Sequence, residues 1–178
     1  MTDAGADATL RARRVRLMLF DVDGVLTDGR LWYGPEGETL KVFDAHDGHG
    51  LKLLLAAGVT VGLVSGRESA AVARRAGELG IAHVAQGVED KRGAVDALAA
   101  RLRFPTDEAG FMGDELVDLP AMRRCGFACA PAEAPDIVRA NAHYVARAPA
   151  GRGAAREVCE FLLRAQGRWN AVLARYLA

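Results

Sequence analysis

The chain has 178 residues, 51% of them apolar, with 23 basic and 23 acidic side chains. This length and composition suit one globular domain with a full hydrophobic core. The balanced charge excludes the broad basic surface that drives nucleic-acid binding, so an anionic ligand must be held by a local site.

Residues 1–14 are small and polar with several arginines, which predicts a disordered N-terminal tail before a single domain over residues 15–178. The apolar segment that follows is too short for a signal peptide core or a membrane span. We therefore expect a cytoplasmic protein without a membrane partner. The three cysteines, Cys125, Cys129 and Cys159, form no CxxC pair and are expected to be small buried hydrophobic residues.

Short β-type runs alternate with helical patterns along the chain. This alternation predicts a Rossmann-like α/β fold, a doubly wound parallel sheet with helices on both faces. The expected strands are Val15–Phe20, Val59–Val64, Ala82–Ala85, Gly110–Met112, Phe127–Ala130 and His143–Val145. The expected helices are Gly48–Ala57, Glu68–Leu79, Lys91–Leu102, Leu119–Cys125, Ala134–Ala140 and Ala154–Gln166.

Three segments fall outside this alternation. Two β-prone runs, Leu31–Tyr33 and Thr39–Phe43, flank the turn signal Gly34–Gly37 and predict a β-hairpin that projects beside the end of the first strand. The glycine-rich stretch Ala148–Gly153 predicts a mobile loop before the last helix. Residues 169–178 extend the last helix pattern.

The most informative feature is an apolar strand that ends abruptly on two carboxylates, Asp21 and Asp23. In open α/β sheets the ligand crevice lies outside the carboxyl ends of the strands, so an aspartate nucleophile is expected here. A DxDG sequence also occurs in solvated turns and calcium loops. An EF-hand loop that starts at Asp21 would need an oxygen ligand at Val25 and a glutamate at Trp32, and both positions fail.

Polar residues also follow later strands. The second strand runs into Ser65, Gly66 and Arg67 before a helix, where phosphate binds well, although a serine there could equally be a helix cap. Lys91 opens the next helix pattern, and by itself it would be a surface lysine. An acidic loop, Gly113–Asp118, follows the fourth strand. Together these groups are expected to converge in one crevice of a parallel sheet.

The four ordered motifs, DVDGVLTD, SGR, Lys91 and GDELVD, resemble those of the haloacid dehalogenase superfamily of phosphohydrolases. The resemblance implies that Asp21 accepts the phosphoryl group as an aspartyl-phosphate. It also implies that Asp23 protonates the leaving alkoxide and then activates water. Ser65, Gly66 and Lys91 would bind the phosphoryl oxygens.

The same resemblance implies a magnesium ion, because Mg²⁺ prefers hard oxygen ligands and shares phosphate oxygens with one or two carboxylates. Asp21, Asp114 and the backbone carbonyl of Asp23 would hold it, and Asp118 would support them without coordinating the ion directly. Many superfamily members have aspartate where this chain has Glu115, and the role of this residue is left open.

No insertion has room for a separate cap domain, which needs on the order of 50 residues, so the site should be open in a monomer. An open site either closes around a large substrate or takes a lid from a neighbouring subunit, and we favour the second. The chain resembles more closely the uncapped tetrameric phosphatases of 3-deoxy-D-manno-octulosonate 8-phosphate, an intermediate of lipopolysaccharide synthesis. The resemblance is carried by DVDGVLTDGRLWYG, the loop Asp47–Gly50, SGR, QGVEDK and residues 151–159.

This resemblance implies a homotetramer and a phosphorylated sugar acid as substrate. Arg67 and Arg152 would bind the sugar-acid carboxylate, for which a guanidinium is well shaped, although Arg152 could equally be an exposed arginine on a flexible tail. Asp47 and Gly48 would contact sugar hydroxyls, or could simply cap a helix. Two alternatives stay open: a phosphatase for a sialic-type nine-carbon sugar acid 9-phosphate, and a regulatory module of this fold without turnover.

Overall fold

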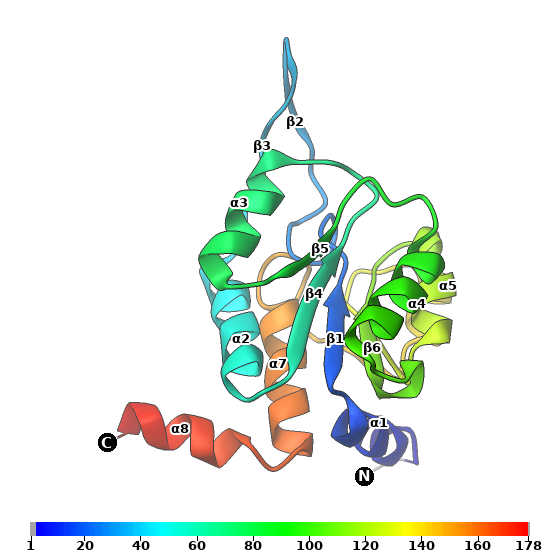
Figure 1. The fold of residues 1–178 in the computed structure, drawn as a ribbon, viewed down its shortest axis with the longest axis vertical. Helices are drawn as coiled ribbons and strands as arrows, with labels where there is room; N and C mark the ends of the chain where they lie inside the picture. The colour runs from blue at the N-terminus through cyan, green and yellow to red at the C-terminus, as the bar shows by residue number, and fades with distance from the viewer. Residues whose placement is uncertain (1–2, 178) are drawn as a thin grey trace.

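A computed structural model describes residues 3–177 (Figure 1). The strands are β1 Leu17–Phe20, β2 Trp32–Gly34, β3 Gly37–Leu40, β4 Thr60–Val64, β5 His83–Ala85, β6 Ala109–Met112, β7 Phe127–Ala130 and β8 Tyr144–Val145. The α-helices are α1 Asp3–Arg14, α2 Ala45–Ala56, α3 Ala70–Leu79, α4 Lys91–Leu102, α5 Leu119–Arg124, α6 Asp136–Ala140, α7 Ala154–Ala165 and α8 Trp169–Leu177. Two 3₁₀ turns complete the fold: η1 Thr106–Glu108 and η2 Leu116–Asp118.

Six strands form one parallel sheet in the order β5-β4-β1-β6-β7-β8. The chain adds strands on one side of β1 and then returns to add the others on its opposite side, so the strand order reverses beside β1. Leu17 of β1 is in register with Thr60 of β4 and with Ala109 of β6. This confirms the predicted doubly wound sheet, and it places the ligand crevice at the carboxyl end of β1.

The side chains of β1 are all buried and alternate between two cores, as expected for a strand covered on both faces. Met18 and Phe20 belong to the core shared with α1, α2, α3, α7 and α8. Leu17 and Leu19 belong to the core shared with α4, α5 and α6. The three cysteines are free and buried, as predicted.

Three helices, α2, α3 and α6, begin at other residues than predicted. Helix α2 begins at Ala45, three residues early, because the side chain of Asp44 accepts hydrogen bonds from the first backbone N–H groups. Helix α3 begins at Ala70, after Ser69 in an extended conformation. Helix α6 begins only after Pro135, whose ψ of 148° is extended. The boundaries of the six strands in the parallel sheet lie within two residues of the predicted ones.

Both chain ends differ from their predictions. Residues 3–14 form α1, so the predicted disordered tail is wrong for this part of the chain, while residues 1–2 lie outside the described residues. Ala8 and Ala12 of α1 are buried, and small residues carry no strong apolar pattern in the sequence. Residues 169–177 form a separate helix, α8, because Gly167 at φ +68° interrupts the predicted continuation of α7.

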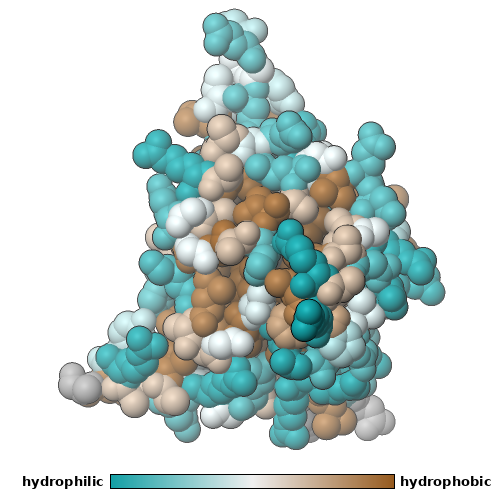
Figure 2. Space-filling view, in the orientation of Figure 1, coloured by the Kyte–Doolittle hydropathy of each residue, from teal (hydrophilic) through white to brown (hydrophobic). Residues whose placement is uncertain are grey.

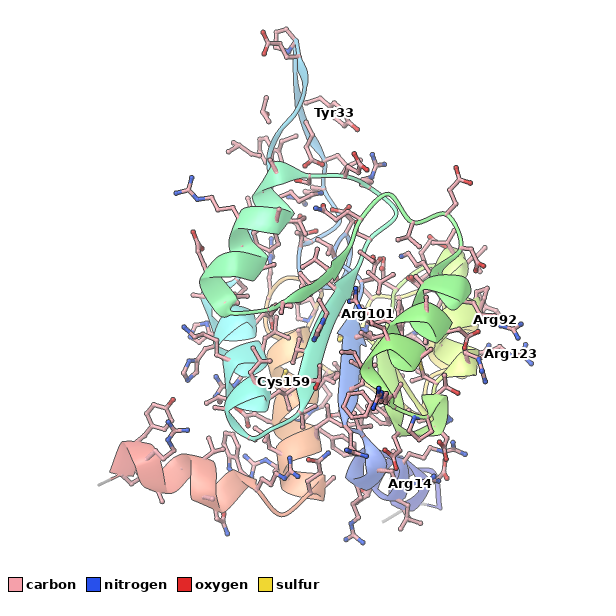
Figure 3. The ribbon with its side chains drawn as sticks, in the orientation of Figure 1. Arg14, Tyr33, Arg92, Arg101, Arg123 and Cys159 are labelled. Atoms are coloured by element: carbon pink, nitrogen blue, oxygen red, sulfur yellow. The ribbon has the colours of Figure 1, made fainter. Side chains whose placement is uncertain are left out.

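Strands β2 and β3 form the predicted hairpin, which projects from the body of the protein (Figure 1). The hairpin ends at Leu40, earlier than predicted, and Tyr33 extends from it into solvent (Figure 3). Four large apolar side chains on or next to the hairpin are exposed: Trp32, Tyr33, Leu40 and Val42. The chain between β1 and α2 therefore contributes an arm with an exposed apolar surface.

The segment Ala148–Gly153, predicted as a mobile loop, is held against the loop that follows β1. The Gly151 N–H donates to the Val25 carbonyl at 3.0 Å, and a Cβ on Gly151 would lie 2.5 Å from the Thr27 carbonyl carbon. The prediction of a mobile loop is therefore corrected: the segment is fixed by this hydrogen bond, and the glycine permits the close approach of the two backbones.

A shallow apolar hollow lies beside the edge strand β5, where Figure 2 shows apolar surface near the middle of the face. Val84, Ala94 and Leu98 are among its lining residues. No helix among residues 3–177 is both long and apolar enough to cross a lipid bilayer.

Candidate active site

A cavity of about 700 Å³ lies at the carboxyl ends of β1, β4 and β6. The structure brings together here most of the residues that the sequence motifs single out. The lining residues are Asp21, Asp23, Gly29, Leu31, Ser65, Gly66, Arg67, Val88, Glu89, Lys91, Asp114, Glu115 and Val117.

Asp21 is positioned by the end of β1. Its N–H continues the sheet ladder by donating to the Met112 carbonyl of β6 at 2.9 Å, and its side chain is buried. The next turn passes through Gly24, which has φ +86°. A Cβ on Gly24 would lie 2.0 Å from Oδ2 of Asp114, so the glycine lets Asp114 approach the backbone of the first loop.

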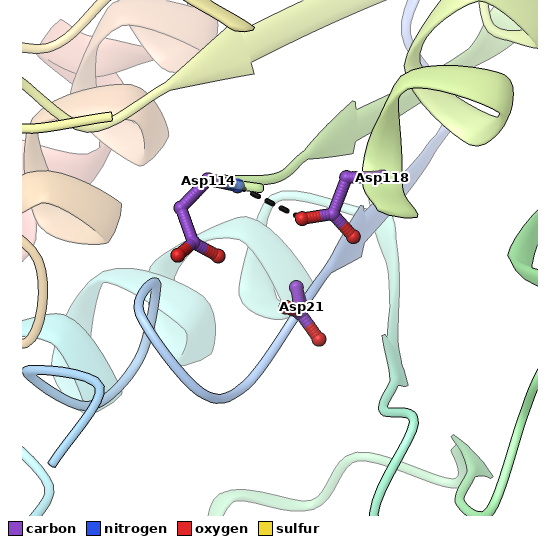
Figure 4. A group of neighbouring side chains, drawn as sticks. All are labelled: Asp21, Asp114 and Asp118. Atoms are coloured by element: carbon purple, nitrogen blue, oxygen red, sulfur yellow. Dashed lines mark hydrogen bonds between the residues drawn. The ribbon is translucent and has the colours of Figure 1, made fainter. Parts of the chain in front are cut away.

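Three aspartates, Asp21, Asp114 and Asp118, each offer an oxygen within 4.8 Å of the others (Figure 4). Asp118 organises the loop after β6, because its Oδ2 accepts the N–H groups of Asp114 and Glu115, both at 3.0 Å. Its Oδ1 accepts a hydrogen bond from Lys91 at 2.6 Å. The ammonium of Lys91 also lies 2.9 Å from Oδ1 of Asp21.

Burial and nearby negative charges raise the pKa of two carboxylates in this group, Asp21 and Asp114. Burial, followed by the charge of Asp118, raises the pKa of Asp21 to about 6 despite the neighbouring Lys91. Burial and the charges of Asp21 and Asp118 raise the pKa of Asp114 to about 8. Burial alone would lower the pKa of Lys91, but the charges of Asp21 and Asp118 raise it. The carboxylates therefore carry more negative charge than Lys91 alone balances.

The group fits a divalent cation. Oδ1 of Asp114 is buried without a hydrogen-bond partner, and Asp21 lies beside it with a second hard oxygen donor. An ion with an all-oxygen preference, such as Mg²⁺, would satisfy the orphan oxygen and offset the excess negative charge. Asp118 already has hydrogen bonds to both of its oxygens, so it supports Asp114 rather than completing the ligand set.

Ser65 and Arg67 occupy the turn after β4. Ser65 is 1% exposed, and its hydroxyl oxygen accepts the N–H of Arg67 at 3.2 Å, which leaves the O–H able to donate. The Arg67 guanidinium is half-exposed; its Nε lies 3.9 Å from Oδ2 of Asp23, and it donates to the Tyr33 hydroxyl at 3.1 Å. The turn thus offers a hydroxyl and a cation to one cavity.

Sequence reasoning missed Lys41, which lies just after the hairpin. Its ammonium is 2.5 Å from Oδ1 of Asp23 and 2.9 Å from Oε2 of Glu38, and its side chain is 1% exposed. Burial alone would lower the pKa of Lys41, but its hydrogen bonds to Asp23 and Glu38 raise it. A lysine in a β-prone run normally faces water. The only signal in the sequence for Lys41 is its place between two apolar residues, Leu40 and Val42.

The structure does not bring every predicted site residue into the cavity. Asp47 and Gly48 are buried and lie outside its lining among residues 3–177. The predicted sugar contact of Asp47 is corrected, because its two oxygens accept the N–H groups of Gly153 at 3.1 Å and Arg156 at 2.7 Å. Asp47 therefore caps the start of α7. Arg152 is exposed and also lies outside this lining.

Known proteins similar to this chain match most of its length. The family model of haloacid dehalogenase-like hydrolases matches residues 84–158. The 3-deoxy-D-manno-octulosonate 8-phosphate phosphatase of Yersinia pestis is 40% identical over 162 residues, which is 91% of this chain and 87% of the relative.

Two solved structures have the same fold, and their sequence identity to this chain is similar to that of the Yersinia relative. A probable YrbI family phosphatase from Pseudomonas syringae has a TM-score of 0.94 and 47% identity, over 97% of this chain and 98% of that one. The 3-deoxy-D-manno-octulosonate 8-phosphate phosphatase of Moraxella catarrhalis was solved with magnesium, phosphate and the sugar acid. It has a TM-score of 0.93 and 38% identity, over 96% of this chain and 98% of that one. The chain is a phosphatase and belongs to the 3-deoxy-D-manno-octulosonate 8-phosphate phosphatase family of haloacid dehalogenase-like hydrolases.

Proposed function

We propose that this phosphatase hydrolyses 3-deoxy-D-manno-octulosonate 8-phosphate to the free sugar acid and phosphate, by way of a phosphoryl group carried on Asp21. The observation that carries the proposal is the position of Asp21. It is a buried carboxylate at the end of the central strand, 2.9 Å from Lys91 and facing a cavity lined by Ser65 and Asp23. The Moraxella relative, solved with the sugar acid and phosphate, supports the substrate.

The reaction would take place in two displacements. In the first, an Asp21 oxygen attacks phosphorus, the ester P–O bond breaks, and Asp23 gives a proton to the departing alkoxide. In the second, Asp23 takes a proton from water, the water oxygen attacks phosphorus, and the bond to Asp21 breaks to release phosphate. Lys91 and Ser65 would hold the phosphoryl oxygens and offset their negative charge.

Mg²⁺ would be held by Asp21, Asp114 and the backbone carbonyl of Asp23, where it supplies electrostatic stabilisation of the transferring phosphoryl group. The orphan Oδ1 of Asp114 supports this assignment. Because Asp21 and Asp114 have raised pKa values in the metal-free protein, the ion would also keep both carboxylates ionised.

The half-exposed guanidinium of Arg67 is the cation that would bind the carboxylate of the sugar acid. It lines the cavity beside Asp23, the residue that would protonate the departing sugar alkoxide. Arg152 stays a predicted contact of the same carboxylate, and its exposed position would need a movement or a second subunit to reach it.

We propose a homotetramer in which neighbouring subunits close the open cavity. The exposed apolar side chains of the hairpin arm, including Trp32 and Val42, support an assembly contact there. The product would enter lipopolysaccharide precursor synthesis in the cytoplasm. Light scattering at assay concentration should give four times the chain mass, and a monomer would refute the shared lid.

A phosphate-release assay tests the substrate. With Mg²⁺, kcat/KM for 3-deoxy-D-manno-octulosonate 8-phosphate should far exceed the values for generic phosphomonoesters and for a sialic-type nine-carbon sugar acid 9-phosphate. Asp21→Asn should abolish release on every ester, because the amide is not a nucleophile. Equal rates on all esters would overturn the substrate, and an active Asp21→Asn variant would overturn the covalent route.

A further inference from the structure

Asp23, the acid and base of the proposed reaction, forms an ion pair with a buried lysine that directly follows the β2–β3 hairpin. Lys41 follows β3, and its ammonium lies 2.5 Å from Oδ1 of Asp23. The lysine side chain is 1% exposed, whereas the Asp23 side chain is 20% exposed. Lys41 therefore contacts one carboxylate oxygen of Asp23, while Asp23 still lines the cavity.

Lys41 is itself fixed from a second side. Its ammonium is 2.9 Å from Oε2 of Glu38, and the other oxygen of Glu38 accepts the Ser69 hydroxyl at 2.7 Å. Ser69 precedes α3, and its N–H donates to Oε1 of Gln86 at 2.8 Å. A continuous set of hydrogen bonds therefore runs from Asp23 through the arm to the body of the domain.

We infer that Lys41 is a positioning residue for the phosphatase reaction, which holds Oδ1 of Asp23 so that Oδ2 is the oxygen that exchanges protons with the leaving alkoxide and with water. This inference rests on the proposed function of Asp23. The physical reason is geometric. A carboxylate with one oxygen held by a buried ammonium loses its freedom to rotate, and proton transfer needs the donor within hydrogen-bond reach of the reacting oxygen.

Comparing two phosphate esters distinguishes a role of Lys41 in positioning the acid from a general structural role. The alkoxide of 3-deoxy-D-manno-octulosonate 8-phosphate is strongly basic and needs a proton as it leaves, whereas 4-nitrophenolate is weakly basic and leaves without one. Lys41→Met should lower kcat/KM for the sugar phosphate by about 10- to 100-fold, as expected for a misplaced catalytic group. The value for 4-nitrophenyl phosphate should fall by a much smaller factor.

The control is Lys52→Met, which removes an exposed lysine of α2 and should leave both values unchanged. A double-mutant cycle provides the second readout: in an Asp23→Asn background, Lys41→Met should add little further loss on the sugar phosphate, because the two residues act as a unit. If Lys41→Met fails to fold, Glu38→Gln, which weakens the other anchor of Lys41, should show the same selectivity with a smaller loss.

Equal losses on the two esters, or the full loss repeated in the Asp23→Asn background, would overturn the positioning role. Failure of the proposed function looks different. An active Asp21→Asn variant would remove the covalent route whatever Lys41→Met does. A wild-type enzyme that prefers another alkyl phosphate would change the substrate, and the comparison of esters would then be made with that phosphate.

Discussion

The Lys91 ammonium donates to Oδ1 of Asp118 at 2.6 Å, and both side chains are buried. The bond joins the start of α4 to the loop after β6, and the same ammonium lies 2.9 Å from Asp21. Lys91 therefore has a structural role besides any contact with phosphate: its positive charge offsets the electrostatic repulsion between the buried carboxylates.

Lys91→Met should destabilise the metal-free protein, because it removes the cation and leaves the buried acids uncompensated. Breaking a buried ion pair from one side predicts a loss of about 3 kcal/mol in the free energy of unfolding, measured by urea denaturation in EDTA. Mg²⁺ should recover more stability in this variant than in the wild type. Lys52→Met is the control, and equal stability of the two variants would show that Lys91 does not compensate the aspartates.

The sequence was sufficient for most of the sheet and for the convergence of the site. Buried parallel strands carry continuous apolar runs, and the first polar residue after each run, such as Asp21 or Ser65, marks the strand's end. Strand order then brings these residues to one crevice without further information.

Lys41 and Asp47 could not be placed in this way, because their roles depend on contacts distant in the chain. The Lys41 side chain is buried through a loop contact with Asp23, 18 residues away, that follows no periodic pattern. Asp47 lies in the first turn of α2, in a sequence that resembles a ligand site, but its partners are backbone N–H groups more than 100 residues later. Helix α1 was missed because alanines, rather than large apolar residues, form its buried face.

The metal-free protein should show a pH-dependent difference in stability from the Asp114→Asn variant. Burial and nearby carboxylates raise the pKa of Asp114 to about 8 in the folded state, so the folded chain binds more protons than the unfolded chain between the ordinary value of 3.8 and about 8. Stability contributed at this position is therefore lost as the pH rises through that window.

Asp114→Asn, which carries no charge, should thus become more stable relative to the wild type as the pH rises from about 5 to about 8 in EDTA. Urea denaturation of both proteins at each pH measures the difference, and the shared histidines cancel in the comparison. Mg²⁺ should reverse the order, because only the wild type has the full ligand set. A difference that does not vary with pH would contradict the raised pKa.

Asp47→Ala should reduce stability without reducing catalysis of the folded enzyme. The substitution leaves the N–H groups of Gly153 and Arg156 without their acceptor, which predicts a loss of about 2 kcal/mol. Asp136→Ala, which changes an aspartate with a 94% exposed side chain, is the control. Denaturation together with kcat/KM below the melting transition separates the two roles, and a large fall in kcat/KM with unchanged stability would restore the sugar contact.

Gly24→Ala should weaken Mg²⁺ binding, and Gly58→Ala provides a closely matched control. Both glycines have nearly the same left-handed backbone, with φ +86° and +82°, so each alanine should cost about 1 kcal/mol of stability from backbone strain alone. They differ in what the new methyl group meets. At Gly24 it would lie 2.0 Å from Oδ2 of Asp114, whereas nothing lies within 4 Å at Gly58.

Isothermal titration with MgCl₂ distinguishes strain from this clash. Gly24→Ala must displace the Asp114 carboxylate and should lose affinity for the ion, while Gly58→Ala should bind as the wild type does at similar stability. Equal affinities would mean that Asp114 can leave Gly24 and still hold the ion, and the close approach of the two would then be irrelevant to the metal site. A selective loss would show that the glycine after the DxD motif is required because a ligand from the fourth motif occupies the space of its missing side chain.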